Sequence, residues 1–389
     1  MRPWNDLRKN MMAVPSLQRH LKIFLQRGSA RWLQKAPVQA QGTPQIYTPG
    51  RQFLRQFQTS FRCGICSQEA GSNVGVRCAK LEGRGLVRLE GPDATELLQG
   101  LVTNDTGVMW GDSRVMYSLF LNTQGRILFD VMCYRVSADT SEQPSFLLEC
   151  DAEVQEKLTR HLKMYRVRKK AEISTADDQL QTWAVFSNNT VDTLLLPISK
   201  TQTTNCDRCP TDVTDPRVEG FGRRVILPKN ESLTRLIPNS TEAGVDDYTL
   251  HRYQWGVPEG VIDLPMGESL PLESNLAFMN GVSFSKGCYL GQELTARTHY
   301  TGVTRKRIMP IEILSHGSSP PDVGAKIISE AGKNIGKLRS YLGNRGLALL
   351  RVAQCKDKKL LVIGEDGSRM ELAALIPTWW PQEQEELRD

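Results

Sequence analysis

The chain has 389 residues, of which 40% are hydrophobic and 24% charged, and its 49 basic residues exceed its 43 acidic ones by six. This composition excludes collagen-like, low-complexity and wholly disordered chains, and the length predicts two or three folded units. No run approaches the roughly 18 consecutive apolar residues of a membrane-spanning helix, so we expect no membrane insertion.

The excess of positive charge lies entirely in the first 64 residues. This segment holds one acid, Asp6, and eleven basic residues: Arg2, Arg8, Lys9, Arg19, Lys22, Arg27, Arg31, Lys35, Arg51, Arg55 and Arg62. Taking these from the totals of 49 and 43 leaves 38 basic and 42 acidic residues, a net charge of −4, on residues 65–389. Because nucleic-acid phosphates require a basic surface, we expect no nucleic-acid partner for the body of the chain.

An Arg-rich and acid-poor N-terminus of this kind is typical of a mitochondrial presequence. Apolar residues recur at helical spacing between Leu17 and Leu25, which gives part of the segment an amphipathic face. The stretch RQFQTS at residues 55–60 fits an Arg-x-Phe-x-x-Ser signal for two-step processing, with a mature chain starting near Ile65. We therefore expect the mitochondrial matrix as the location. The alternative is a disordered basic tail that binds anions.

Nine cysteines, scattered through a long chain, favour a reducing compartment over a secreted disulfide framework. Two Cys-x-x-Cys pairs occur, Cys63/Cys66 beside the proposed cleavage site and Cys206/Cys209 in a polar stretch that is expected to be a loop. Zinc needs about four ligands, and no further Cys or His pair follows at a fitting spacing. Two exposed thiols in this loop are therefore expected rather than a metal site.

The body of the chain begins with short strands and helices in alternation. A strand, a turn and a helix are expected over residues 80–106, because apolar residues change from strand to helical spacing around the turn at 91–93. A hairpin is expected over 114–135. Further strands are expected over 147–150, 183–186, 193–196 and 223–227, and helices over 152–165 and 245–255. The basic run 166–170 suits a helix C-terminus, with anion binding as the alternative.

The pattern changes to short strands at close spacing from residue 307 onward. We expect strands over 307–314, 325–329, 336–341, 346–351, 360–363 and 370–376. Six short strands separated by Gly- and Pro-containing turns predict a small closed or nearly closed barrel. Trp379 and Trp380, which follow the last strand, are expected to be packing residues rather than a ligand cage.

One segment, residues 286–293 with the sequence KGCYLGQE, carries the most chemistry. Two glycines flank Cys288 and allow the backbone to turn tightly and approach a ligand or partner. A helix is expected to begin at Gln292, so its dipole and Lys286 would both favour the thiolate. A thiolate attacks electrophiles or ligates soft iron or copper. The alternative is an inert, half-buried cysteine in a turn.

This octapeptide resembles the signature KGCYxGQE of the YgfZ-type folate-binding proteins, which are relatives of the glycine-cleavage T-protein. Other stretches resemble motifs of the same family, in family order, across residues 80–378: GPDA at 91–94, LQG at 98–100, TND at 103–105, LNTQGRIL at 121–128, YRVR at 165–168, DPR at 215–217, GVPEG at 256–260 and PLE at 271–273. With the presequence, the resemblance implies a mitochondrial factor of this family in late iron–sulfur cluster assembly. It implies an A-type iron–sulfur carrier and [4Fe–4S] recipient proteins as partners.

The resemblance also implies a fold and a domain order. The fold class is α+β, a T-protein-like multi-domain fold with ferredoxin-like α/β units around a central cleft and a small C-terminal β-barrel. Residues 1–64 would be the disordered presequence. Residues 65–175 would form an N-terminal α+β domain completed by 240–305, residues 176–239 a central α+β domain, and residues 306–389 the barrel.

The implied site centres on Cys288, which would ligate a transient iron–sulfur cluster shared with the carrier, since a self-contained cluster needs about four ligands. The remaining motif residues would orient the loop or hydrogen-bond the cluster sulfurs: Lys286, Gly287, Tyr289, Gly291, Gln292 and Glu293. Tetrahydrofolate is the second implied cofactor. Arg252 matches the Arg with which the fold holds a folate carboxylate, and Asn104 and Asp105 would either face the cleft or cap a helix end.

Two departures from T-protein-type enzymes weigh against catalysis. Those enzymes carry consecutive acids after Gly-Gly in the hairpin and a Thr-Gly-Glu segment whose Glu reads the pterin ring. The corresponding stretches here read GRILFD at 125–130 and EGFGR at 219–223. Without these carboxylates, the chain lacks the groups that would transfer protons to a substrate and recognise the pterin ring. We therefore expect that the protein is not an enzyme. The alternatives are a folate-dependent one-carbon (aminomethyl-type) transferase and an accessory to tRNA modification.

Four further side chains are assigned mainly structural roles. Tyr289 is expected to pack against the central domain rather than to stack on a cofactor. His299, close after the signature, is expected to make a hydrogen bond at a helix terminus, with metal ligation as the alternative. Cys133 and Cys150 lie in apolar strands and are expected in the core.

Overall fold

The computed structural model describes residues 75–111, 113–137, 143–187, 212–237, 240–315, 320–355, 358–364 and 367–381. The presequence with its processing signal, both Cys-x-x-Cys pairs and the strand expected over 193–196 lie outside the described residues. Among the described residues, no helix is long and apolar enough to cross a membrane.

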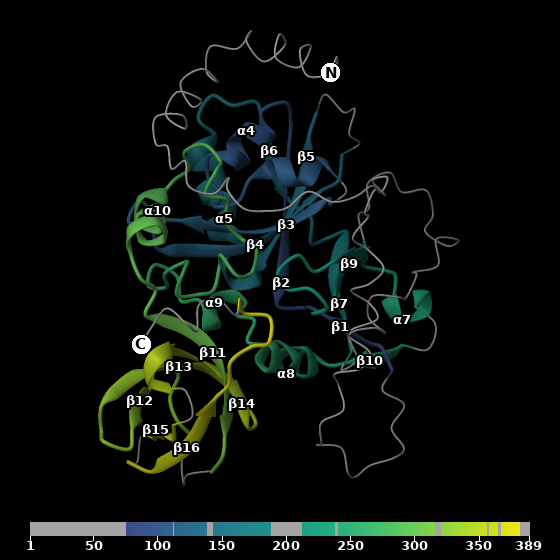
Figure 1. The fold of residues 1–389 in the computed structure, drawn as a ribbon. Coiled ribbons are helices and arrows are strands. Elements are labelled where there is room, and N and C mark those ends of the chain that lie inside the picture. Colours follow the sequence, from purple (N-terminus) through teal and green to yellow (C-terminus); the bar gives the residue numbers. More distant parts are fainter. Residues whose placement is uncertain are drawn as a thin grey trace, which may run out of the picture. The chain divides into compact units, whose positions relative to one another are not determined.

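The first sheet is antiparallel and has five strands in the order β3-β4-β5-β2-β6 (Figure 1). Its strands are β2 (Arg84–Glu90), β3 (Val115–Leu121), β4 (Ile127–Arg135), β5 (Ser145–Asp151) and β6 (Glu172–Thr175). Successive side chains of a strand point to opposite faces. Met116 and Phe120 of β3 therefore pack in a cluster with residues of the helices α4 (Ala94–Gln99) and α5 (Gln155–Arg166), whereas Tyr117 and Leu119 belong to a cluster on the other face.

The second sheet has the order β10-β1-β7-β9-β8. Its strands are β1 (Arg77–Lys80), β7 (Leu180–Phe186), β8 (Asp212–Thr214), β9 (Arg223–Pro228) and β10 (Thr241–Ala243). β1 runs parallel to β10 and antiparallel to β7. β1 therefore belongs to the second sheet although it comes first in the chain. The expected domain boundary at residue 175 lies between β6 and β7, but β1, which precedes it, belongs to the sheet on the other side. The short helix α7 (Leu233–Leu236) contributes to the cluster on the outer face of this sheet.

The C-terminal strands close into a six-stranded barrel in the order β11-β14-β13-β12-β15-β16. They are β11 (Lys306–Ile313), β12 (Lys326–Ser329), β13 (Asn334–Leu342), β14 (Arg345–Arg351), β15 (Leu360–Ile363) and β16 (Arg369–Ala374), with the helical turn α11 (Val352–Cys355) after β14. All six expected strands and the closure of the barrel are confirmed. Trp379 donates from Nε1 to the carbonyl of Trp255 at 2.8 Å, and the Trp380 ring packs edge-on against Phe278, so both are packing residues.

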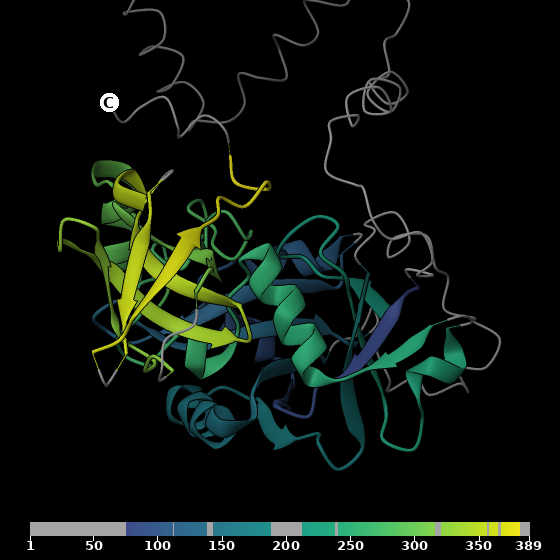
Figure 2. The same ribbon diagram turned by 90° about the horizontal axis from the view of Figure 1, so that it is seen from below.

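Helix α8 (Val245–Trp255) lies between the barrel and the second sheet (Figures 1 and 2), and it contacts β14, β11 and β13 on one side and β1 on the other. It ends at Gly256, whose φ of 71° is left-handed. A Cβ at this glycine would come within 2.8 Å of the Pro310 ring, so the close approach of helix and barrel requires glycine here. The helix has the bounds expected from the sequence.

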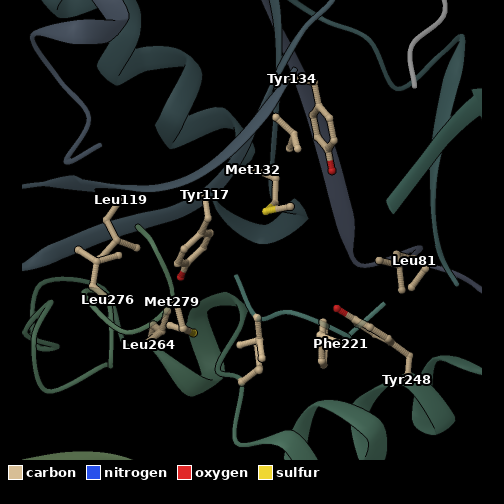
Figure 3. Packing of buried hydrophobic residues seen from close by; sticks show 14 of the residues in the cluster. Leu81, Tyr117, Leu119, Met132, Tyr134, Phe221, Tyr248, Leu264, Leu276 and Met279 are labelled. Atoms are coloured by element: carbon tan, nitrogen blue, oxygen red, sulfur yellow. The ribbon is translucent and has the colours of Figure 1, made fainter. Parts of the chain in front are cut away.

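A shared core holds the sheets, α8 and the barrel together. In Figure 3, Tyr117 and Met132 of the first sheet point toward Leu264 and Met279 from the connection after α8. The same cluster includes residues of the second sheet, of α8 and of the barrel: Ala184, Phe186, Tyr248, Tyr253, Ile308 and Leu347. Burial of this apolar surface is the main stabilising contribution that fixes the three parts against one another.

Candidate functional site

The segment that carries the cysteine signature, residues 283–291, is called here the cysteine loop. It precedes helix α10 (Gln292–Thr301) and packs on the end of α4. The amide of Ser283 donates to the carbonyl of Thr103 at 3.1 Å, and the amide of Leu290 donates to the carbonyl of Gly100 at 3.0 Å. Cys288, between these two attachments, is exposed. The loop is therefore held at both ends while its thiol faces solvent.

Lys286 is the main side-chain anchor of the cysteine loop. Its ammonium donates to three backbone carbonyls, those of Gln99 at 2.7 Å and of Val102 and Asn104 at 2.8 Å. These carbonyls stand at and just after the C-terminus of α4, where a cation is favoured. All three protons are thereby used to dock the loop, so of the two roles weighed for Lys286, orienting the loop and hydrogen-bonding the cluster sulfurs, the contacts support the first. Burial lowers the pKa of Lys286 to about 8, while the charge of Asp105 acts in the opposite direction.

The second half of the cysteine loop packs against the turn of the β3–β4 hairpin. Gly291 has a φ of 78°, and a Cβ there would collide with the carbonyl oxygen of Asn122 in that turn. Gln292 closes the loop locally, because its Oε1 accepts from the amide of Tyr289 at 3.2 Å and its own amide donates to the carbonyl of Tyr289 at 3.3 Å. Two sequence motifs about 170 residues apart thus form one structural unit.

The other motif residues divide into buried and exposed positions. Tyr289 is buried in the shared core, as expected, and burial followed by the nearby Glu293 carboxylate raises its pKa to about 12. Glu293 is exposed in the first turn of α10. Gly287 is exposed as well, and a Cβ there would meet no atom within 4 Å.

Three aromatic rings fasten the far end of α10 to the start of the cysteine loop. His299 stacks on Phe284 with ring centroids 3.5 Å apart and an interplanar angle of 7°. Tyr300 packs edge-on against both rings and donates from its hydroxyl to the carbonyl of Phe284 at 3.2 Å. The main contact of His299 is therefore a ring stack rather than the expected helix-terminus hydrogen bond.

The other cysteines that the structure describes are buried: Cys78, Cys133, Cys150 and Cys355. Burial raises the pKa of each of these thiols, to about 12 for Cys150 and to about 11 for Cys355. The core positions expected for Cys133 and Cys150 are confirmed. Within the described ranges, no group of three or more His, Cys, Asp or Glu side chains is arranged to hold a metal ion. Cys288 is thus the described cysteine that can reach a partner.

Asn104 and Asp105 have internal roles at the end of α4. The Asn104 side chain donates to the carbonyls of Tyr117 at 2.9 Å and Asn280 at 2.8 Å. The Asp105 carboxylate accepts from the amide of Gly107 at 2.9 Å and caps the 3-10 helix η1 (Thr106–Trp110). Of the two roles weighed for them, the contacts support capping and cross-linking.

Between the two sheets lies a buried network of ionic side chains, called here the central charge cluster. It comprises Arg84, Arg217, Arg224, Arg252, Asp130, Glu149, Asp215, Glu259 and Asp263. Arg217 joins Asp215 and Glu259, each at 2.7 Å, and Arg224 also pairs with Glu259. Burial alone would raise the pKa of Glu259, but Arg224 and Arg217 hold it well below its usual range.

Asp130 is the acid that the hairpin retains where T-protein-type enzymes have consecutive acids. Its carboxylate lies 3.3 Å from Arg84 Nη1, and Arg84 Nε lies 3.0 Å from Glu149. Burial raises the pKa of Asp130, with Arg84 opposing the shift. The carboxylate is therefore enclosed and paired inside the protein, which makes it a poor acid–base group for a substrate.

Arg252, assigned by resemblance to a folate carboxylate, points into this cluster. Its Nη1 lies 2.6 Å from the Asp263 carboxylate and donates to the carbonyl of Val257 at 3.2 Å. Asp263 also accepts from the Ser340 hydroxyl of β13 at 2.5 Å. Because the guanidinium already has an internal carboxylate, the residues present do not fit a folate carboxylate at this position. Folate binding through Arg252 stays a prediction that these contacts do not support.

The sequence reasoning missed the central charge cluster. Two of its parts lie in recognised motifs, DPR at 215–217 and GVPEG at 256–260, but pairing between them is not visible from spacing. An Asp-x-Arg pair, in which Arg217 Nε returns to Asp215 at 3.0 Å, is the one local signal that could have indicated a buried ion pair.

Comparisons with known proteins match two domains of the chain and its fold. Residues 72–203 match the family model of the GCVT N-terminal domain, and residues 305–382 match that of the CAF17 C-terminal beta-barrel domain. The glycine cleavage system aminomethyltransferase T from Bartonella henselae has a similar structure, with a TM-score of 0.60 and 15% identity over 79% of this chain and 87% of that one. This likeness confirms the expected T-protein-like α+β fold.

Proteins related in sequence over most of their length identify the family more closely than the fold does. The iron–sulfur cluster assembly factor IBA57, mitochondrial, of Mus musculus is 41% identical over 82% of this chain and 89% of its own length. The protein of the same name from Homo sapiens is 40% identical over 86% and 96%. A homologue from Mycosarcoma maydis is 34% identical over 79% and 86%. The chain belongs to the family of the mitochondrial iron–sulfur cluster assembly factor IBA57.

Proposed function

We propose that this protein is an accessory factor of iron–sulfur cluster assembly in the mitochondrial matrix. It acts with an A-type iron–sulfur carrier in the maturation of [4Fe–4S] recipient proteins. Cys288 supplies one thiolate to a transient cluster whose remaining ligands come from the carrier. The cluster is cargo that passes through the complex, not a resident cofactor of this chain.

One observation carries the proposal: Cys288 is exposed on a loop that is fixed at both ends. An iron–sulfur cluster needs about four protein ligands, and the described part of the chain offers no clustered set of ligating side chains. A single presented thiolate is therefore suited to completing a coordination shell on another protein. The anchoring by Lys286 supports the same role, since a pre-organised ligand loses less conformational entropy on binding.

The test mixes the protein with the carrier, iron and sulfide under anaerobic conditions and records the visible absorption of the isolated complex. The wild-type complex should carry cluster absorption, and Cys288→Ala should lose or shift it. Cys355→Ala, which removes a buried thiol, is the matched control and should behave as wild type. An unchanged cluster spectrum with Cys288→Ala would refute ligation by this residue.

A second variant tests the contribution of loop docking while the thiol of Cys288 is kept. Lys286→Met keeps Cys288 but removes the three hydrogen bonds that dock the loop. We expect it to form the cluster-bearing complex with reduced yield, because the loop must then be ordered on binding. Full wild-type yield would show that docking by Lys286 does not contribute.

Folate-dependent one-carbon transfer has less support. Arg252 is paired with Asp263, and Asp130 is enclosed with Arg84, so each of these charged groups already has an internal partner of opposite charge. Titration calorimetry with tetrahydrofolate distinguishes the two functions, because a transferase must bind it and turn it over. An accessory role in tRNA modification has no observation in its favour, since residues 65–389 carry a net charge of −4.

The proposed location rests on the names of the relatives and on the N-terminal segment. The three relatives described above are named mitochondrial, and residues 1–64 have the composition of a presequence. A fusion of residues 1–64 to a reporter protein should be imported into the matrix. A reporter that stays in the cytosol would contradict this location.

A further inference from the structure

A cleft lies away from Cys288, where the barrel meets the first sheet. Its volume is about 460 Å³. Its walls come from β11, β13 and β14 of the barrel, from the segment 268–273, and from Arg126 next to the turn of the β3–β4 hairpin. These parts are distant in sequence, so the cleft exists only in the folded chain.

The cleft gathers positive charge. Five basic side chains line it, with two carboxylates, Glu268 and Glu273: Arg126, Lys306, Lys337, Arg339 and Arg351. Among the described residues, none of these five cations lies within 4.0 Å of a carboxylate. Arg126 donates instead to the backbone carbonyl of Glu268 at 2.7 Å. The lining therefore carries three positive charges in excess, and converging like charges are unfavourable without an anion.

One of these five cations, Arg339, has a hydrogen-bond donor that lacks an acceptor in the described part of the chain. Its Nε is shielded from solvent and has no hydrogen-bond partner among the described residues. Burial lowers the pKa of this guanidinium despite the opposing charges of Glu268 and Glu273. A shielded and unsatisfied donor on a cation costs free energy unless a ligand accepts from it.

A less polar lobe of about 340 Å³ adjoins the cleft and shares with it Leu270, Glu273, Lys306 and Arg351. The other residues that line this second lobe are Pro271, Leu272, Val303, Thr304, Arg305 and, from α10, Leu294, Thr295 and Thr298. The pair of lobes thus offers a strongly charged end and a less polar end. The less polar end touches α10, the helix that begins four residues after Cys288.

We propose that this two-lobed cleft binds a small organic anion with at least two negative charges, a phosphorylated or polycarboxylate metabolite. The anionic group lies among Arg126, Arg339 and Arg351, whose planar guanidinium groups match phosphate and carboxylate oxygens in pairs. The uncharged part of the ligand occupies the lobe under α10. The proposal does not depend on cluster ligation by Cys288.

Calorimetry with two probes, pyrophosphate and citrate, tests the site in the wild-type protein at concentrations up to about 10 mM. Binding of pyrophosphate alone points to a phosphorylated ligand, and binding of citrate alone points to a polycarboxylate. Arg339→Gln should weaken the bound probe by about tenfold, since it removes a charged donor. Glu273→Gln should bind several-fold more tightly, because it removes a carboxylate that repels the anion.

Three controls keep the test decisive. Lys163→Gln removes an exposed cation from α5, outside the cleft, and should bind as wild type. Lys337→Gln, on the exposed rim, should weaken binding even if Arg339→Gln does not fold. Cys288→Ala should leave the affinity unchanged. Failure of both probes to bind, or equal affinity of wild type, Arg339→Gln and Lys337→Gln, would overturn the proposal.

Discussion

The central charge cluster and the cysteine loop use polar side chains in opposite ways. In the cluster, four arginines and five carboxylates are enclosed and paired with one another: Arg84, Arg217, Arg224, Arg252, Asp130, Glu149, Asp215, Glu259 and Asp263. In the cysteine loop, Lys286 and the backbone carry the hydrogen bonds, and the thiol of Cys288 is left exposed.

This difference shows where a binding partner can act. The charged groups in the centre, where the resemblance to T-protein-type enzymes implies a cleft, are paired with one another, although Nε and Nη1 of Arg224 and Nε of Arg252 have no hydrogen-bond partner among the described residues. Buried charges that already have partners of opposite charge favour one arrangement of the sheets and leave no unpaired carboxylate or guanidinium for a ligand. The cysteine loop, in contrast, has a fixed backbone and an available thiol. We therefore assign a structural role to the central charge cluster and the binding of a partner to the cysteine loop.

The largest effect is expected from breaking the central charge cluster. Glu259→Gln leaves Arg217 and Arg224 without the carboxylate that joins them. Loss of one partner of a buried ion pair lowers the free energy of unfolding by about 3–5 kcal/mol, because the other charge remains buried. Glu219→Gln, at an exposed position, is the control and should change it by less than about 0.5 kcal/mol. Chemical denaturation measures both, and equal stability of the two variants would contradict the role of the cluster.

A pH effect of intermediate size is expected from His251 in the same part of the core. It is buried and lies 2.8 Å from the carbonyl of Phe221 through Nε2. Burial lowers its pKa to about 4, against about 6.5 in an unfolded chain. The folded state therefore binds fewer protons. Stability is full above pH 6.5 and falls as the pH drops from 6.5 toward 4, by up to about 3 kcal/mol.

His251→Gln tests this assignment, because it removes the titrating group. The variant should show a flatter dependence of unfolding free energy on pH between 6.5 and 4. If His251→Gln retained the wild-type slope, the acid sensitivity would belong to other groups of the core.

The smallest effect is expected at two glycines of the cysteine loop, Gly291 and Gly287, which differ in their surroundings. Gly291→Ala forces a Cβ against the carbonyl of Asn122 at a left-handed φ, and should destabilise the protein by about 1–3 kcal/mol. Gly287→Ala meets open space and should cost less than about 0.5 kcal/mol. Thermal unfolding of the two variants checks the difference. Equal melting temperatures would show that the contact with the hairpin turn does not hold the loop.

Local patterns in the sequence were sufficient for most of the fold. The six barrel strands and helix α8 follow from apolar spacing and turn residues that lie within a few positions of one another. β1 was missed because its four residues, RCAK, contain too few apolar positions to alternate, and its place is decided by distant partners in β7 and β10.

The site shows the same division between local and distant information. The motif around Cys288 was visible as a short segment, and so was the helix that follows it. Orientation of the loop was one of the two roles expected for Lys286, but its acceptors were not predictable, because they are backbone carbonyls more than 180 positions away, which carry no side-chain signal. The pairing of Arg84 with Glu149, 65 positions apart, was hidden for the same reason.

Alkylation of the cysteines, followed peptide by peptide, tests the central claim most directly. In the free native protein, Cys288 should react readily, whereas the buried Cys78, Cys133, Cys150 and Cys355 should react only on unfolding. In the anaerobic complex with the cluster-bearing carrier, Cys288 should become protected, and it should react again when the cluster is removed by a chelator. Cys288 that reacts equally fast in the free protein and in the cluster-bearing complex would contradict the account.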